Sequence, residues 1–128
     1  MGTVATRGVV VSAKARFEPA HSDPKAARFI FSYRITIANR GKEAVQLLRR
    51  HWIIRDSLAA PRQVEGPGVV GETPVIQPGE EYSYSSACDL RSAFGRMEGT
   101  YLMRYVPGGQ VFRAAIPVMQ LLTPISAN

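Results

Sequence analysis

The sequence is poor in cysteine, histidine and long apolar runs. Cys88 is the single cysteine, so a disulfide framework within one chain is excluded, and we predict a buried thiol in a reducing cytoplasm. His21 and His51 lie far apart and match no zinc or cobalt ligand set, so no metal site and no cofactor are expected. No apolar run approaches the roughly 20 residues of a membrane helix, and no apolar leader is visible at the N-terminus. A cytoplasmic protein without a membrane partner is therefore predicted.

Acidic residues are also scarce. Ten of them stand against 16 lysines and arginines, which gives a net charge of +6. Such a charge favours anionic partners in general, but the basic residues are spread along the chain and no recognition helix is visible. The tyrosines alternate with polar residues, as in strands with a buried face, rather than forming a stacking platform (Tyr82, Tyr84, Tyr101 and Tyr105). We therefore expect no specific nucleic-acid partner.

Apolar residues alternate with polar ones along most of the chain. In residues 28–39, one face carries Phe29, Phe31, Tyr33, Ile35 and Ile37. Similar patterns predict strands over residues 4–17, 45–56, 80–89, 95–106 and 110–120. No segment has a convincing helical period. The pattern predicts an all-β fold with residues 1–128 as a single domain, an immunoglobulin or fibronectin type III-like β-sandwich of about seven or more antiparallel strands.

Residues 45–56 give a mixed strand pattern. Strict alternation places Leu48, Trp52 and Ile54 on one face together with Arg50, while Val45 and Leu47 fall on the other face. In residues 110–120 the same rule groups Phe112, Ala114, Ile116 and Val118. Pro117 is expected on an edge strand or at a strand end, because proline cannot donate a ladder hydrogen bond.

The segment 63–86 contains the spacing Gly66-x-Gly68-x-x-Gly71. In dinucleotide-binding proteins this spacing precedes a helix whose N–H groups hold a pyrophosphate. Here Pro74, Pro78 and Gly79 follow, and they break helices. The glycines are therefore expected in a turn-rich segment between strands. They serve either as a structural connection with positive φ or as a cradle for a nucleotide, pyrophosphate or polyphosphate.

Arginines near these glycines are candidates for such a cradle, namely Arg50 and Arg62. The structural alternative for Arg50 is an ion pair with Glu65 or Glu98 that braces the loop. On the opposite face of the same strand, a possible binding surface is formed by Arg49, His51 and Arg55. His51 has no evident nucleophile or carboxylate partner, so no catalytic residue is predicted and we expect the protein not to be an enzyme.

The chain resembles the ApaG domain family, also known as domain of unknown function 525. The matching motifs are Phe29-x-Phe31-x-Tyr33-x-Ile35-x-Ile37, Leu47-Leu48-x-Arg50-His51-Trp52, Val64-x-Gly66-x-Gly68-Val69-Val70-Gly71-x-x-Pro74, and Tyr82-x-Tyr84-x-Ser86. The resemblance implies a fibronectin-like sandwich and, in bacteria, a small free-standing cytoplasmic protein. It also implies an association with cobalt and magnesium resistance. Eukaryotic members carry the domain in F-box proteins and in a polymerase-interacting protein.

The resemblance supplies no catalytic motif. Together with the absence of a nucleophile–base pair, it predicts a non-enzymatic binding module for an unknown protein partner. Nucleotide or pyrophosphate binding through Gly66, Gly68 and Gly71 with Arg50 and Arg62 is the alternative. The sequence is compatible with a monomer or a homodimer, because the edge strands of a small sandwich can pair.

Overall fold

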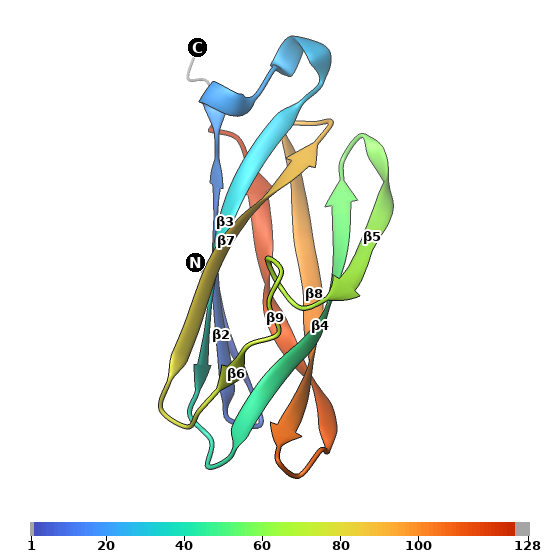
Figure 1. The fold of residues 1–128 in the computed structure, drawn as a ribbon. Coiled ribbons are helices and arrows are strands. Elements are labelled where there is room, and N and C mark those ends of the chain that lie inside the picture. The colour runs from blue at the N-terminus through green and yellow to red at the C-terminus, as the bar shows by residue number, and fades with distance from the viewer. Residues whose placement is uncertain (1, 125–128) are drawn as a thin grey trace.

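The computed structural model describes residues 2–124 and consists of two antiparallel sheets (Figure 1). Within these residues there is no α-helix, only two short 3₁₀ turns, η1 (Pro19–His21) and η2 (Pro24–Ala26). The strands are β1 (Gly2–Thr6), β2 (Val9–Phe17), β3 (Phe29–Asn39), β4 (Ala44–Asp56), β5 (Ala59–Pro67), β6 (Val75–Ile76), β7 (Glu81–Leu90), β8 (Phe94–Val106) and β9 (Val111–Leu122). The predicted β-sandwich of the immunoglobulin and fibronectin type III kind is confirmed.

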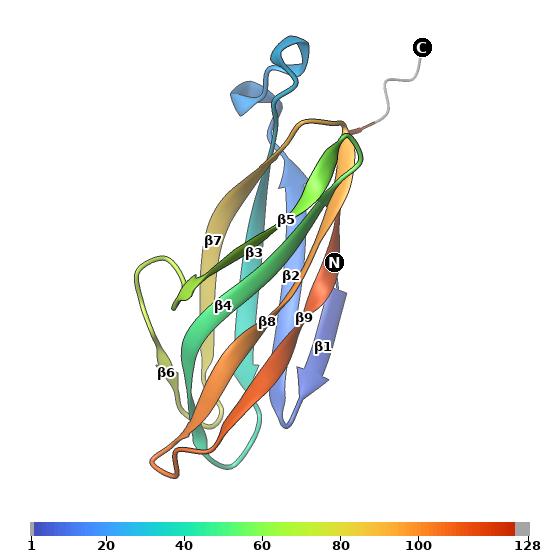
Figure 2. The ribbon, with the colours of Figure 1, turned by 90° about the vertical axis from the view of Figure 1, so that its right-hand side faces the viewer.

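The two sheets face each other and leave two open sides. The first sheet has the order β1-β2-β3-β7 and the second has the order β5-β4-β8-β9, with β6 joined to β4. Strands β1 and β9 lie along one side, and β6 and β7 lie along the other (Figure 2). On the β1 side, the backbone N–H of Ala115 donates to Thr6 Oγ1 at 3.2 Å, which links the sheets.

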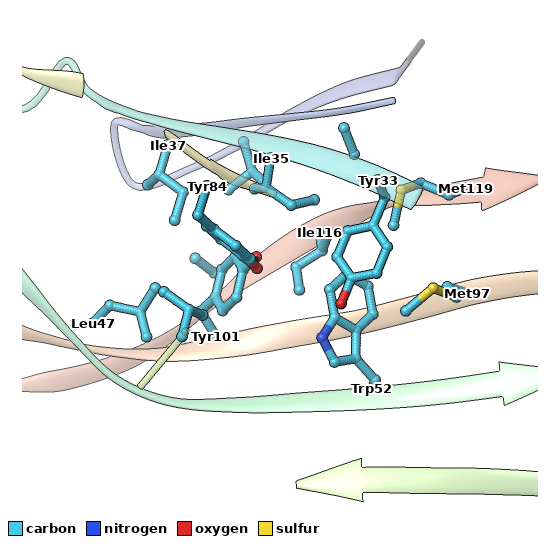
Figure 3. Packing of buried hydrophobic residues seen from close by; sticks show 14 of the residues in the cluster. Tyr33, Ile35, Ile37, Leu47, Trp52, Tyr84, Met97, Tyr101, Ile116 and Met119 are labelled. Carbon is cyan, nitrogen blue, oxygen red and sulfur yellow. Dashed lines mark hydrogen bonds between the residues drawn. The ribbon is translucent and has the colours of Figure 1, made fainter. Parts of the chain in front are cut away.

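The core lies between the inner faces of the sheets. Alternation predicts the inner face of β3 correctly, since Phe31, Tyr33, Ile35 and Ile37 are buried. Trp52 packs edge-on against Tyr33, with ring centroids 5.5 Å apart (Figure 3). Such edge-to-face pairs stabilise a core beyond the effect of the area they bury.

The mixed face predicted for β4 is wrong in part, because β4 contains a bulge. Its pairing with β8 shifts register between Leu47 and Arg49. One extra residue in a strand reverses the alternation beyond it. Val45 and Leu47 therefore point into the core together with Trp52, whereas strict alternation places them on the opposite face.

A second register shift separates two parts of β9. Met97 and Gly99 of β8 pair with Met119 and Ile116, so β9 carries one additional residue between these positions. The prediction that Val118 shares the buried face of Ile116 is wrong, because Val118 is 49% exposed. Pro117 lies in this irregular part of an edge strand, as expected for a residue without a backbone donor.

Two strand boundaries also differ from the prediction. Residues 4–17 form two strands because Arg7 and Gly8 both have positive φ, 48° and 83°, and make a tight turn. Strand β5 replaces part of the expected turn-rich segment and includes Gly66. Strand β5 therefore continues the second sheet beyond β4 and positions the glycine segment at its edge.

Candidate functional site

The glycine segment forms a two-residue β-hairpin at the end of β5. The N–H of Val69 donates to Glu72 O at 2.8 Å, and the N–H of Glu72 donates to Val69 O at 2.9 Å. The two central residues, Val70 and Gly71, have φ values of 43° and 82°. Positive φ at both positions is typical of a type I′ turn, and we call residues 69–72 the 69–72 hairpin.

A different structural reason requires glycine at each of the three positions of the predicted pattern. A Cβ on Gly66 would lie 3.1 Å from Arg50 Nη2. A Cβ on Gly68 would lie 2.0 Å from Glu72 O, and its φ is 59°. Gly71 has open space around it, but its φ of 82° disfavours any side chain. The spacing therefore follows from packing and backbone conformation without a ligand.

Arg50 braces the hairpin from β4. It is paired with Gly66 of β5, and its guanidinium points toward the inner face of the sheet. Arg50 Nη1 donates to Pro67 O at 2.9 Å and to Gly68 O at 3.0 Å. Hydrogen bonds to a charged donor are stronger than neutral ones, so this contact holds the start of the hairpin against β4.

The ion pair predicted for Arg50 is wrong, although the bracing role remains. Glu65 lies beside Arg49, with Nε and Oε1 3.8 Å apart. Glu98 accepts a hydrogen bond from Arg55 Nε at 2.5 Å. Both carboxylates thus lie on the outer face of the sheet, and Arg50 donates to backbone carbonyls instead of pairing with a carboxylate.

The backbone N–H groups of the segment are mostly used within the protein. Gly68 N–H donates to Leu48 O at 2.9 Å, and Val69 N–H bonds across the hairpin. Within residues 2–124, no acceptor is found for the N–H groups of Val70 and Gly71 at the tip. An anion cradle requires several converging N–H groups, and this segment turns carbonyls, rather than N–H groups, toward its arginine.

Arg62 is not brought to the glycine segment. Its Nη2 donates to Asp89 O at 2.6 Å and to Asp89 Oδ1 at 3.1 Å, which ties β5 to β7. Cys88 lies beside this contact and is buried, as predicted. Burial raises the pKa of its thiol to about 11, although the nearby Arg62 acts in the opposite direction.

A pocket of about 220 Å³ opens beneath the hairpin, between the two sheets. Its lining consists of Tyr33, Arg50, Trp52, Val69, Val70, Gly71, Tyr84 and Ser86. Of these residues, Tyr33 and Trp52 hold their rings against each other in the core (Figure 3). Burial raises the pKa of Tyr33, and the neighbouring Ser86 hydroxyl lowers that pKa in part. The pocket combines aromatic surface, one guanidinium and hydroxyl groups.

A buried tyrosine pair stabilises the core next to this pocket. The hydroxyls of Tyr84 and Tyr101 are hydrogen-bonded to each other, one strand coming from each sheet. Burial is the main cause that raises the pKa of both phenols. They remain neutral at physiological pH and act as a structural link.

The predicted outer-face residues of β4 separate into two places. Arg49 and His51 line a small hollow of about 30 Å³, and His51 Nε2 lies 2.8 Å from Gln63 Oε1. Arg55 lies further along the strand with Glu98. His51 therefore contacts an amide. Glu65 and Thr100 lie opposite it on the neighbouring strands and line the same hollow, but within residues 2–124 neither is hydrogen-bonded to His51.

Sequence reasoning missed Val70 as a candidate. It is 57% exposed and holds a left-handed backbone conformation, which β-branched residues rarely adopt. The sequence Val-Val-Gly lacks the Asn-Gly or Asp-Gly signature of such turns, so only the glycine hinted at the geometry. Tyr33 and Ser86 were also missed, because only the topology brings β3, β4 and β7 to one pocket.

Within residues 2–124, no helix has the length and apolar character needed to span a membrane. No group of three or more His, Cys, Asp and Glu side chains in this part of the chain is placed to hold a metal ion.

Comparison with known proteins gives a consistent family match. Residues 19–105 match the ApaG domain (DUF525). "Protein ApaG" of Methylorubrum extorquens is 44% identical over 119 residues, covering 93% of this chain and 91% of that relative. "Protein ApaG" of Anaeromyxobacter sp. is 42% identical and covers both chains completely. A crystal structure described as the putative ApaA protein from Bordetella pertussis superimposes with a TM-score of 0.87 at 36% identity, covering 92% of this chain and 95% of that one.

Proposed function

The chain belongs to the ApaG domain family, and we propose that it is a non-catalytic module that binds a partner protein through the 69–72 hairpin and the pocket beneath it. The observation that carries this proposal is Val70. An exposed apolar side chain stands at the tip of a braced hairpin, in a conformation that costs free energy. A turn selected only for stability would place asparagine or glycine at this position. Contact with a partner would explain why an apolar residue is kept there.

The pocket supports the same function. Its volume of about 220 Å³ suits a single side chain of a partner. Trp52 and Tyr33 offer aromatic surface, and aromatic residues are enriched where partners contribute most of the binding energy. Arg50 is held by Pro67 O and Gly68 O, so the mouth of the pocket is rigid before binding.

The proposal places the protein in the cytoplasm. Cys88 is its single cysteine and is buried, as expected for a protein of a reducing compartment. The absence of catalysis is supported by His51, which contacts Gln63, and by Cys88, whose pKa is raised.

Nucleotide or pyrophosphate binding is the second candidate. In its favour, the pocket contains the Arg50 guanidinium, and the net charge of the protein is +6. Against it, Gly68 and Val69 use their N–H groups internally, and Arg62 binds Asp89 elsewhere. The protein-binding function therefore has the better geometric support.

The test uses Val70→Asn, which is expected to fold at least as well as the unaltered protein. Immobilised protein is exposed to an extract of the cells that produce it, and captured proteins are quantified. We expect at least one protein to be retained strongly by the unaltered chain and at least tenfold less by V70N. Val111→Asn is the matched control, because Val111 is a valine of similar exposure, 52%, on β9.

Retention of every captured protein by V70N at the level of the unaltered chain would overturn the proposal. Calorimetric titration with pyrophosphate, ATP and diadenosine tetraphosphate at low and moderate salt tests the second candidate. Saturable binding that survives moderate salt and is lost in Arg50→Met would replace protein binding by anion binding as the function of the pocket. Heat that disappears with salt would reflect generic attraction to a basic surface.

A further inference from the structure

Strand β2 is longer than the strand that covers its outer edge. Strand β1 pairs with residues 9–13 of β2, and β2 continues to Phe17. Within residues 2–124, no strand pairs with the outer edge of residues 15–17 (Figure 2). An uncovered edge directs alternate N–H and C=O groups outward, where another strand can bind them. This edge lies on the opposite open side of the sandwich from the 69–72 hairpin.

A groove continues the course of β1 along this edge. It has a volume of about 370 Å³ and is formed by Gly2, by residues 13–15 of β2 and by residues 118–120 of β9. Strand β1 itself lies between the same two strands further along, since a Cβ on Gly2 would come within 3.0 Å of Pro117 Cβ. The position next to β2 is therefore one that an extended strand already occupies over part of its length.

The outer face beside this edge is positively charged. Lys14 and Arg34 are direct partners in the pairing of β2 with β3, and like charges opposite each other destabilise a sheet. Within the described residues, neither Lys14 nor Arg34 forms an ion pair, whereas Arg16 pairs with Glu18, with Nε and Oε2 3.8 Å apart. A hollow of about 240 Å³ lies among Lys14, Arg16 and Arg34. A carboxylate brought to this face would relieve the repulsion.

We propose that the uncovered edge of β2 binds an extended acidic segment of a partner protein, which continues the line of β1. Residues opposite each other in neighbouring strands share a face. A residue opposite Ala15 would therefore point into the groove toward Val118 and Met119, and should be apolar. A residue opposite Arg16 would point outward, next to Lys14, and should be Asp or Glu. Backbone hydrogen bonds provide affinity in such strand addition, and the alternating side chains provide specificity.

A second copy of this chain fits the edge less well than an acidic segment. Antiparallel pairing of two β2 edges would bring Lys14 and Arg16 of both copies onto one face. The repulsion between them acts against self-association, as charged side chains on edge strands commonly do. The side chains of the edge thus favour a partner of opposite charge.

The probe is a fluorescent, N-acetylated peptide of alternating Glu and Val, seven residues long, measured with the full chain. We expect saturable binding, with amide shifts in NMR spectra confined to residues 14–17 of β2 and 118–120 of β9. The same peptide with Lys in place of Glu should bind at least tenfold more weakly. A Glu peptide with proline at its centre should also bind at least tenfold more weakly, because it lacks a backbone donor.

A charge exchange provides the matched variants. Lys14→Glu should weaken binding of the Glu peptide at least tenfold and allow the Lys peptide to bind, and it removes the repulsion with Arg34, so folding should be retained. Lys42→Glu, an equal charge change in the turn after β3, should leave Glu-peptide binding unchanged. The proposal is overturned if the Glu peptide does not bind, or if the proline peptide binds as strongly as the Glu peptide. It is also overturned if the peptide shifts amide signals of the 69–72 hairpin, or if the signals of the β2 edge change with protein concentration and not with peptide, which would indicate self-association.

Discussion

The hairpin tip offers a stability test that also bears on the proposed function. Val70 has a φ of 43° in a turn whose other central residue, Gly71, has a φ of 82°. An L-residue in this left-handed region loses roughly 1–2 kcal/mol, and a β-branched side chain is among the least tolerant. Asn-Gly is the favoured pair for a type I′ turn. Val70→Asn should therefore stabilise the fold by about 1 kcal/mol.

The gain is large enough to measure by urea denaturation. With an m-value of about 1.5 kcal/mol/M for a small domain, 1 kcal/mol corresponds to a midpoint increase of about 0.7 M. The increase in melting temperature should be about 4 °C. Little apolar burial is lost, because the Val70 side chain is 57% exposed. The slope m should not change, since the surface exposed on unfolding is nearly the same.

Val70→Ala orders the series, because it removes the branched side chain without adding a preference for the left-handed region. We expect the midpoint of V70A to lie between those of the unaltered chain and V70N. A midpoint for V70N at or below that of the unaltered chain would refute the strain argument. It would also remove the main reason for assigning Val70 to partner binding.

Four further predictions follow from the same geometry. Gly68→Ala should destabilise the fold by about 3 kcal/mol or more, because the added Cβ clashes with Glu72 O. Gly71→Ala should cost only about 1 kcal/mol, because its Cβ meets open space. Equal urea midpoints for the two variants would contradict this difference. Arg50→Met should cost about 1–3 kcal/mol, since Pro67 O and Gly68 O lose their charged donor, and an unchanged midpoint would show that the brace is dispensable. Burial raises the pKa of Asp56, but the hydrogen bonds that it accepts from Ser92, Arg91 N–H and Leu58 N–H, together with the charge of Arg62, outweigh this effect and lower the pKa. The stability gained in this way is present above the ordinary carboxyl pKa and is lost as the pH falls through the lowered value. Asp56→Asn should therefore flatten the dependence of the urea midpoint on pH below about pH 4. The thiol of Cys88 should react with a thiol reagent at pH 8 only after unfolding, because burial raises its pKa to about 11.

Alternation was a reliable guide wherever strands are regular. The inner face of β3 and the tyrosine face of β7 follow from period two, because each has one buried and one solvated face. It failed at Leu47 and Val118, where an extra residue reverses the faces, and a bulge leaves no clear signal in composition. It also failed for the beginning of β5, where Ala59 and Pro61 give little strand preference and pairing with β4 decides.

The candidate site was predictable in its residues but only partly in its contacts. Arg50 and the glycines are neighbours because β4 and β5 are adjacent. Arg62 has the same charge and lies near them in sequence, yet it meets Asp89 across the open side of the sandwich. Long-range pairing between the sheets decides which arginine reaches the hairpin, and a single sequence does not encode that pairing in any local pattern.

The bulge in β4 has a consequence for transplanting the hairpin. The interval from Leu47 to Arg50 is odd, so a regular strand would turn one of these two side chains to solvent. The additional residue lets both face inward. If β4, β5 and the hairpin were copied onto a scaffold with regular strands, either Leu47 would face the core or Arg50 would reach the hairpin, but not both. A segment transplanted to another protein should therefore begin at Val45, before the bulge, and include the bulge.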